Sequence, residues 1–216
     1  MDLRGLKKIS WIWLPKLVFA GVLLFFIYLL LLITWQYVPM RYDVAFLNLK
    51  SDEIQFLYYK IAFFTHVYTS WAVILIGFFQ FWKLIRFRYP NLHRLFGKLY
   101  IFIILIFSAP SGLVMSFVAN GGIWAQISFV VLSILWIFFT YKSYQFARSK
   151  NWKKHEEYIL RSYALTLSAV SLRLFKMIIA NVFDLPPMDT YRFVAWLGWI
   201  FNLCIVELYI RRKANR

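Results

Sequence analysis

Six runs of about 20 consecutive apolar residues divide this chain of 216 residues, and no other feature constrains its fold as strongly. A helix of about 20 residues crosses a hydrocarbon core roughly 30 Å thick. Backbone groups in lipid must be satisfied within the protein, so such runs form either helices or a closed barrel. The strict apolar/polar alternation of barrel strands is absent, which excludes a barrel. The sequence therefore predicts an all-α, polytopic integral membrane bundle of six transmembrane helices.

The predicted helices and the short segments between them form a single transmembrane domain, residues 1–216. Their approximate limits are 17–38, 59–82, 96–118, 123–141, 158–183 and 191–210. The first run is too long for the apolar part of a signal peptide, so we interpret it as a retained helix.

The composition agrees with this fold and limits the partners. Hydrophobic residues make up 62% of the chain, more than a soluble domain of this size can bury. The net charge of +16 could suggest nucleic acid. However, Lys and Arg cluster in short segments between the apolar runs, where membrane orientation explains them. We therefore expect no nucleic acid partner; the lipid bilayer is the expected partner, with a membrane protein as a further candidate.

The distribution of Lys and Arg predicts the orientation. The N-terminal segment holds four, residues 83–98 five, residues 142–161 six and the C-terminal tail four. These nineteen lie on one side of the predicted bundle, and the connections on the other side hold four cations and five of the nine acids. Cytoplasmic loops are enriched in Lys and Arg. Both termini are thus predicted to be cytoplasmic (N-in/C-in).

Local signals agree with these limits. Tyr37 and Tyr100 are among the aromatic residues at predicted span ends, where such rings prefer the headgroup level. Residues 120–122 (Asn-Gly-Gly) predict a tight turn, and the Pro186-Pro187 pair predicts a break before the last helix.

The fifth predicted helix carries a small and polar stripe. The stripe recurs at helical spacing and consists of Ser162, Thr166, Ala169, Arg173 and Lys176. In one interpretation Lys176 extends toward the interface while Arg173 pairs with carbonyls or with Asp184. In the other, the stripe lines a polar cavity that receives an anionic group, such as a heme propionate, a lipid headgroup or a substrate carboxylate.

His66, in the second predicted helix, lies at a depth comparable to that of Arg173. Such a histidine either makes hydrogen bonds within the bundle or ligates heme b, whose axial ligands come from facing helices at equal depth. No second histidine lies in the outer half of the predicted spans. Met115 or Met177 would have to complete a His/Met pair.

A second polar cluster is predicted at the inner edge of the bundle. His93 and His155, each in a basic segment, lie at the depth of Glu207 and could hold heme or a metal, with Arg161 available to an anionic group. In the alternative interpretation His93 faces headgroups and Glu207 pairs with Arg161 or Arg211.

Several of these segments resemble a bacterial membrane family known as domain of unknown function 2306 (DUF2306). They are residues 77–81, 90–100, 155–166, 169–174 and 196–202, followed by Glu207. The resemblance extends over about three-quarters of the chain and implies a bacterial cytoplasmic (inner) membrane protein. The chain departs from the family at 158–160 (Tyr-Ile-Leu), where a Trp-Met pair is expected, and so lacks one sulfur ligand candidate. The hairpins with histidine are also loosely similar to cytochrome b561 and ferric-reductase bundles, by analogy of fold alone.

Two classes of function follow from these patterns. The first is a non-catalytic membrane component: an assembly factor, a lipid-binding scaffold or a small transporter. The second is a membrane redox protein of the cytochrome b561 type, with heme b as the candidate cofactor; its binding residues would come from His66, His93, His155, Arg161 and Arg173. No phosphate-binding loop or hydrolase motif is present, and the sequence leaves open whether the chain is an enzyme.

Overall fold

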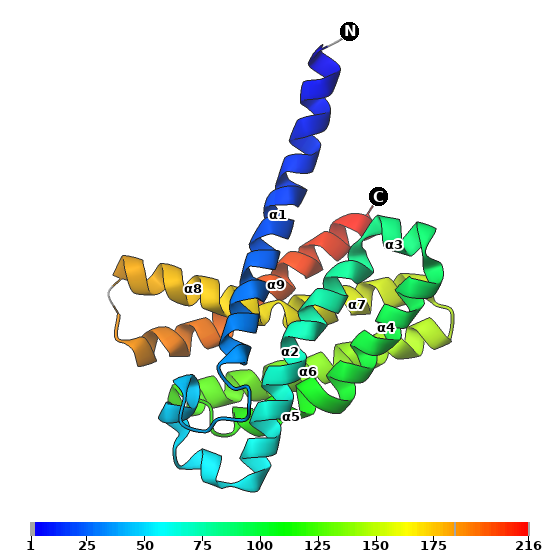
Figure 1. Cartoon of the computed structure of the whole chain (residues 1–216). Coiled ribbons are helices and arrows are strands. Elements are labelled where there is room, and N and C mark those ends of the chain that lie inside the picture. The colour runs from blue at the N-terminus through cyan, green and yellow to red at the C-terminus, as the bar shows by residue number, and fades with distance from the viewer. Residues whose placement is uncertain (1–2, 184, 216) are drawn as a thin grey trace.

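The computed structural model describes residues 3–183 and 185–215, and in this part of the chain every regular element is a helix (Figure 1). The all-α prediction is confirmed. The long elements are α1 (Leu3–Trp35), α2 (Leu57–Phe81), α4 (Pro90–Ile103), α5 (Ala109–Ser116), α6 (Gly122–Arg148), α7 (Trp152–Thr166), α8 (Ser168–Phe183) and α9 (Pro187–Ala214). The shorter ones are η1 (Ala45–Lys50), η2 (Glu53–Gln55), α3 (Lys83–Arg88) and the π-helical η3 (Ile104–Ser108).

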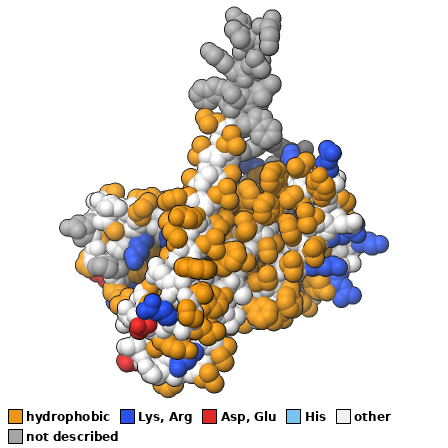
Figure 2. Space-filling model, viewed as in Figure 1, with side chains coloured by type: hydrophobic (Ala, Val, Ile, Leu, Met, Phe, Trp, Pro, Cys, Tyr) orange, Lys and Arg blue, Asp and Glu red, His pale blue; other side chains and the backbone are white. Residues whose placement is uncertain are grey.

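The surface of the molecule is that of a membrane protein. Large apolar side chains such as Phe102, Ile134 and Phe193 are exposed on three different helices. Figure 2 shows hydrophobic side chains over the flank of the bundle, with Lys and Arg at one end and both basic and acidic residues at the opposite end. Such a surface suits lipid as the solvent along the flank and water at the two ends.

Four helical segments are long and apolar enough to cross a membrane: α2, the continuous stretch α4–η3–α5, α6 and most of α9. They confirm four of the six predicted spans. The fifth predicted span is present but broken, because α7 and α8 meet at an angle of 41°. Within the described residues the apolar part of α1 is Ala20–Trp35, which is shorter than a full span, so six crossings are not confirmed.

The main core forms where α6 packs between α5, α7 and α9. Tyr100 is fully buried there, and its hydroxyl group bonds Ser162 Oγ at 3.1 Å and Thr166 Oγ1 at 2.8 Å. Tyr37 is also buried, against Phe63 of α2. Both rings therefore pack inside the protein, whereas their depth in the membrane stays a prediction. Helix α4 begins at Pro90, so Tyr100 lies almost three turns inside the helix.

The third predicted span contains a π-helical segment, η3, immediately before Pro110. Proline has no N–H group and clashes with the preceding helical turn. A π-helical turn changes the register of backbone bonds, as the bond from Ala109 N to Ile104 O shows. The wider turn lets the helix continue through the proline and leaves the carbonyl of Ser108 within reach of another helix.

The fifth predicted span breaks at Leu167, between α7 and α8. Thr166 Oγ1 donates to the carbonyl of Ser162 at 3.1 Å, a contact that often accompanies helix bending. The carbonyl of Ala164, beside the break, accepts a hydrogen bond of 3.0 Å from Asn202 Nδ2 on α9. Ser171 Oγ donates to Asn202 Oδ1 at 2.8 Å. Asn202 thus gives the backbone at the break a hydrogen bond that lipid cannot provide.

Beyond the break, α8 packs closely against α9. A Cβ at Gly198 would lie 3.1–3.2 Å from the backbone and Cβ atoms of Leu172, so glycine allows the two helices to approach. The predicted turn at 120–122 is confirmed: Gly121 has φ +93°, a conformation that favours glycine, and precedes α6. The predicted break at Pro186-Pro187 is confirmed as well, because α9 begins at Pro187.

We predict that Gly198→Val separates α8 from α9 and destabilises the fold by about 1–3 kcal/mol, because the added methyl groups meet backbone atoms. Gly21→Val is the matched control, since a Cβ there meets no atom within 4 Å. Thermal unfolding in detergent measures both variants. Equal losses of stability would contradict the close α8–α9 contact.

Candidate functional site

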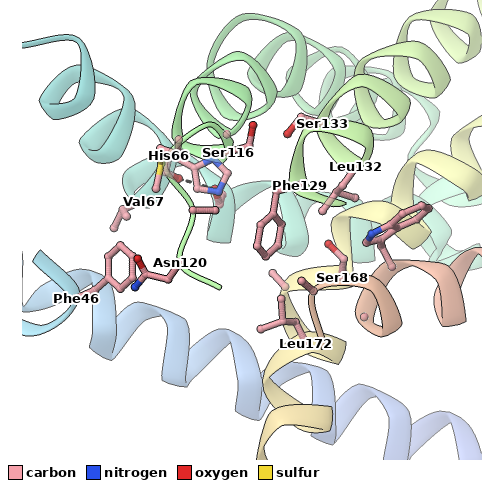
Figure 3. Close-up of a pocket in the computed structure, with 18 of the residues that line it drawn as sticks. Phe46, His66, Val67, Ser116, Asn120, Phe129, Leu132, Ser133, Ser168 and Leu172 are labelled. Carbon is pink, nitrogen blue, oxygen red and sulfur yellow. Dashed lines mark hydrogen bonds between the residues drawn. The ribbon is translucent and has the colours of Figure 1, made fainter. Parts of the chain in front are cut away.

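A cavity of about 500 Å³ lies among α2, α5, α6, α8 and α9, at the end of the bundle that carries η1 and the α5–α6 turn (Figure 3). Pockets for small molecules have volumes of about 300–1,000 Å³. The apolar part of the wall is aromatic and aliphatic and includes Phe63, Phe129, Leu132, Trp136, Leu165, Leu172 and Trp199. The polar part includes Lys50, Tyr59, His66, Ser70, Ser133, Thr166, Ser168, Arg173, Lys176 and Tyr191.

Both irregular helices border this cavity. Gly112 and Met115 come from α5, after the π-helical turn, and Thr166 and Ser168 lie on either side of the α7–α8 break. The 41° bend turns α8 away from the line of α7. The cavity is therefore a consequence of the two breaks and of small residues such as Gly112 in its wall.

Arg173 and Lys176 lie on successive turns of α8 and both line the cavity. Arg173 is half-buried and donates from Nη1 to the carbonyl of Ala169 at 2.7 Å. The Lys176 ammonium lies 6.0 Å from the centre of the Tyr191 ring. Among the described residues, neither cation forms an ion pair, and no carboxylate lines the cavity. The predicted pairing of Arg173 with a carbonyl is confirmed; Asp184 lies outside the described residues.

A third cation of the cavity wall, Lys50, is already neutralised. Its Nζ donates to Glu53 Oε1 and to the carbonyl of Val118, each at 2.6 Å, and the side chain is 5% exposed. The hydrogen bond from Lys50 lowers the pKa of the Glu53 carboxyl. This contact joins the α1–α2 connection to the end of α5, so Lys50 holds the rim of the cavity together.

His66 points from α2 toward α5. Its Nδ1 lies 2.8 Å from the carbonyl oxygen of Ser108, in the π-helical turn. A carbonyl only accepts, so Nδ1 carries the proton and donates. A Cβ at Gly112 would lie 3.1–3.2 Å from the imidazole, so glycine makes room for the ring. Within the described structure Nε2 has no hydrogen-bond partner, and His66 lines the cavity.

Two hydroxyl groups of the cavity wall also lack a hydrogen-bond partner in the described structure, as His66 Nε2 does. Ser133 and Ser168 are buried residues that line the cavity, and neither side chain bonds another group in the described part of the chain. Figure 3 shows both serines and His66 around the cavity together with Phe129 and Leu172. Buried polar atoms are normally hydrogen-bonded. The wall therefore presents polar atoms that are suited to a polar molecule in the cavity.

Of the residues predicted to cluster at the inner edge, Arg161 and His155 bond other groups of the protein. Arg161 Nη2 donates to Glu207 Oε2 at 3.0 Å, which joins α7 to α9 and confirms the predicted Arg161–Glu207 pair. His155 Nδ1 donates to the carbonyl of Ser143 at 2.9 Å. His93 is part of α4, and its buried Nδ1 has no partner in the described structure. Among the described residues, no group of three His, Cys, Asp or Glu side chains is arranged to hold a metal ion.

The structure thus separates the predicted site residues into two groups. His66 and Arg173 line one cavity, together with three further members of the predicted stripe, Thr166, Ala169 and Lys176. His93, His155 and Arg161 do not line it. That any of the five binds a cofactor stays a prediction.

Other residues of the site were not predicted. Trp136 and Trp199 carry no charge to mark them among ten tryptophans, and only the packing of α6 against α9 places them in the cavity wall. Lys50 lies outside every predicted span, and its sequence gives no sign that it is buried.

Comparison with known proteins agrees with this description. The family described as "Predicted membrane protein (DUF2306)" matches residues 63–210. The chain belongs to this family. No curated protein and no solved structure matches the chain, and the similarity to cytochrome b561 finds no support. The matched segment begins in α2 before His66 and ends in α9. It contains the wall of the DUF2306 cavity except for Ile33 of α1, the α1–α2 connection and Tyr59 at the start of α2.

We predict that Arg173→Leu lowers folding yield and stability more than Lys176→Leu. Arg173 is half-buried and bonds a carbonyl, whereas the exposed Lys176 makes no hydrogen bond in the described structure. Fluorescence-detected size exclusion and thermal unfolding in detergent measure the difference. Equal tolerance of both substitutions would count against the assigned position of Arg173 in the cavity.

Proposed function

We propose that this DUF2306 protein is a non-catalytic membrane component that binds an amphipathic anion in its cavity, as a lipid-binding scaffold or a small transporter does. The observation that carries the proposal is the pair Arg173 and Lys176, which line an otherwise largely apolar cavity with no carboxylate in the described wall. The anionic end of the ligand lies at these cations, and its apolar chain lies along the aromatic wall.

The energetics of membrane insertion support this assignment. A cation near the centre of a membrane helix costs about 2.5–3.5 kcal/mol on insertion scales, so it is retained only where something offsets that cost. The single carbonyl bond of Arg173 and the ring contact of Lys176 offset a part of it. An anionic ligand offsets the rest, because charge-assisted hydrogen bonds are stronger in a low-dielectric site.

The two helix breaks favour a ligand site near the middle of the bundle. In many transporters the substrate site is formed by interrupted helices whose irregular backbone lines a cavity. Here the α7–α8 break borders the cavity, and α5, the helix that follows the π-helical turn, forms part of its wall. We therefore place binding at the two breaks.

For the orientation we propose six crossings, with α1 as the first and α7–α8 as the fifth, both termini in the cytoplasm, and the bacterial inner membrane as the location. Helix α1 has 33 residues, about 50 Å of helix, and so is long enough to cross. The nineteen cations of the two termini and the basic connections support their side of the bundle as cytoplasmic. The cavity then lies in the outer half of the membrane.

Topology reporters test this arrangement. We expect fusions of a cytoplasmically active fluorescent protein after residue 216 and within residues 149–151 to fluoresce. Fusions at residues 119–121 should instead activate a periplasmic phosphatase. Reporters that place the two chain ends on opposite sides would contradict the proposed six crossings.

A binding experiment tests the ligand class. Calorimetry of the purified protein in a neutral detergent with oleoyl lysophosphatidate, a single-chain phosphate lipid, should give saturable binding. Arg173→Gln and Lys176→Gln should each weaken it about 10- to 100-fold, because a hydrogen bond to a charged group is worth about 1.5–3 kcal/mol. Lys98→Gln, at an exposed cation of α4 outside the cavity wall, is the matched control. Undetectable binding, or equal weakening by all three substitutions, would reject the proposal.

Heme b stays the second candidate, since His66 and Met115 line the same cavity as Arg173. A His/Met pair ligates iron in some cytochromes, and an arginine suits the propionates. A reduced-minus-oxidised spectrum of the purified protein distinguishes the candidates. Heme bands that disappear in both His66→Ala and Met115→Leu would replace the lipid proposal, and a spectrum without them would remove the heme alternative.

A further inference from the structure

We infer that His66 acts as a hydrogen-bond acceptor for the ligand, so that the bound molecule carries a hydroxyl group near its anionic end. This inference rests on the proposed function and narrows its ligand class to hydroxyl-bearing anionic lipids. Three observations lead to it: the fixed tautomer of the imidazole, the charges around it and the position of the ring in the cavity wall.

The tautomer is fixed by the π-helical turn. His66 Nδ1 donates to the carbonyl of Ser108 at 2.8 Å, so the neutral ring carries its lone pair on Nε2. The hydroxyl groups of Thr69 and Ser108, 2.7 Å apart, join α2 to the same turn. Gly112 packs beside the ring. These contacts hold the imidazole in one orientation.

The charges of the cavity favour a neutral ring. Arg173 and Lys176 line the same cavity, and its described wall holds no carboxylate to stabilise a third positive charge. A neutral Nε2 can only accept a hydrogen bond. A carboxylate or a fully ionised phosphate only accepts as well and is a poor partner for it, whereas a hydroxyl group donates.

The position of the ring completes the assignment. His66 and Ser133, on α2 and α6, both line the cavity that Arg173 and Lys176 line from α8. A molecule whose anionic group contacts α8 therefore presents its adjoining atoms to His66 and Ser133. A hydroxyl group on the carbon next to a phosphate gives the ligand both an anion for the cations of α8 and a donor for His66. Lysophospholipids and other polyol phosphate lipids have this arrangement.

A pair of ligands and one variant test the inference. Oleoyl lysophosphatidate has a free 2-hydroxyl group, and its 2-O-methyl ether has the same charge and chain without the donor. We expect the wild-type protein to bind the hydroxyl form about 3- to 10-fold more tightly, the effect of one hydrogen bond. His66→Asn keeps an amide N–H where Nδ1 donates to Ser108 and removes Nε2. This variant should fold normally and bind both lipids with the affinity of the wild type for the ether.

The outcomes separate this inference from the proposed function. If the wild type binds both lipids equally and Arg173→Gln weakens both, the anion site stands and the role of His66 is refuted. If His66→Asn keeps the preference for the hydroxyl form while Ser133→Ala loses it, Ser133 contacts the hydroxyl and the assignment to His66 is wrong. If neither lipid binds, the proposed function itself fails.

Discussion

The requirement that every backbone group find a partner inside the protein governs this fold. Lipid offers no hydrogen bonds, so a helix can be interrupted only where another group of the protein replaces the missing contacts. Asn202 does this at the α7–α8 break by donating to the carbonyl of Ala164, and His66 does it at the π-helical turn by donating to Ser108. The α7–α8 break borders the cavity, and α5, which follows the π-helical turn, lines it. The cavity thus depends on two side chains that satisfy backbone atoms from neighbouring helices.

The electrostatics of the cavity follow from this geometry. The bend at Leu167 turns α8 away from the line of α7, so that Arg173 and Lys176 line the cavity. A straight helix five would pack its polar stripe against the neighbouring helices, where cations without acids are strongly unfavourable. Gly198 holds α8 against α9 in its new direction. The cations are therefore accessible to a ligand because the helix is broken.

Much of this could be predicted from the sequence, and the limits have physical causes. Long apolar runs predict helices in lipid, and residues 3, 4 and 7 positions apart share a face, so the stripe from Thr166 to Lys176 was found from spacing alone. The break at Leu167 was not, because no proline or glycine marks it and its partner, Asn202, lies 35 positions later. The burial of Tyr100 was not predicted, because Lys98 looked like a loop cation, whereas α4 begins eight residues earlier at Pro90.

The structural and functional roles of His66 are linked rather than alternative. An asparagine could supply the same donor to the carbonyl of Ser108, but its short side chain would place no group where Nε2 lies. A neutral imidazole that donates through Nδ1 carries an acceptor at Nε2, the other nitrogen of the ring. The proton that stabilises the π-helical turn therefore also determines the polarity that the cavity presents to its ligand. The same lone pair could also bind the iron of a heme. The choice between lipid and heme therefore depends on which of the two molecules matches the shape and charge of the rest of the cavity.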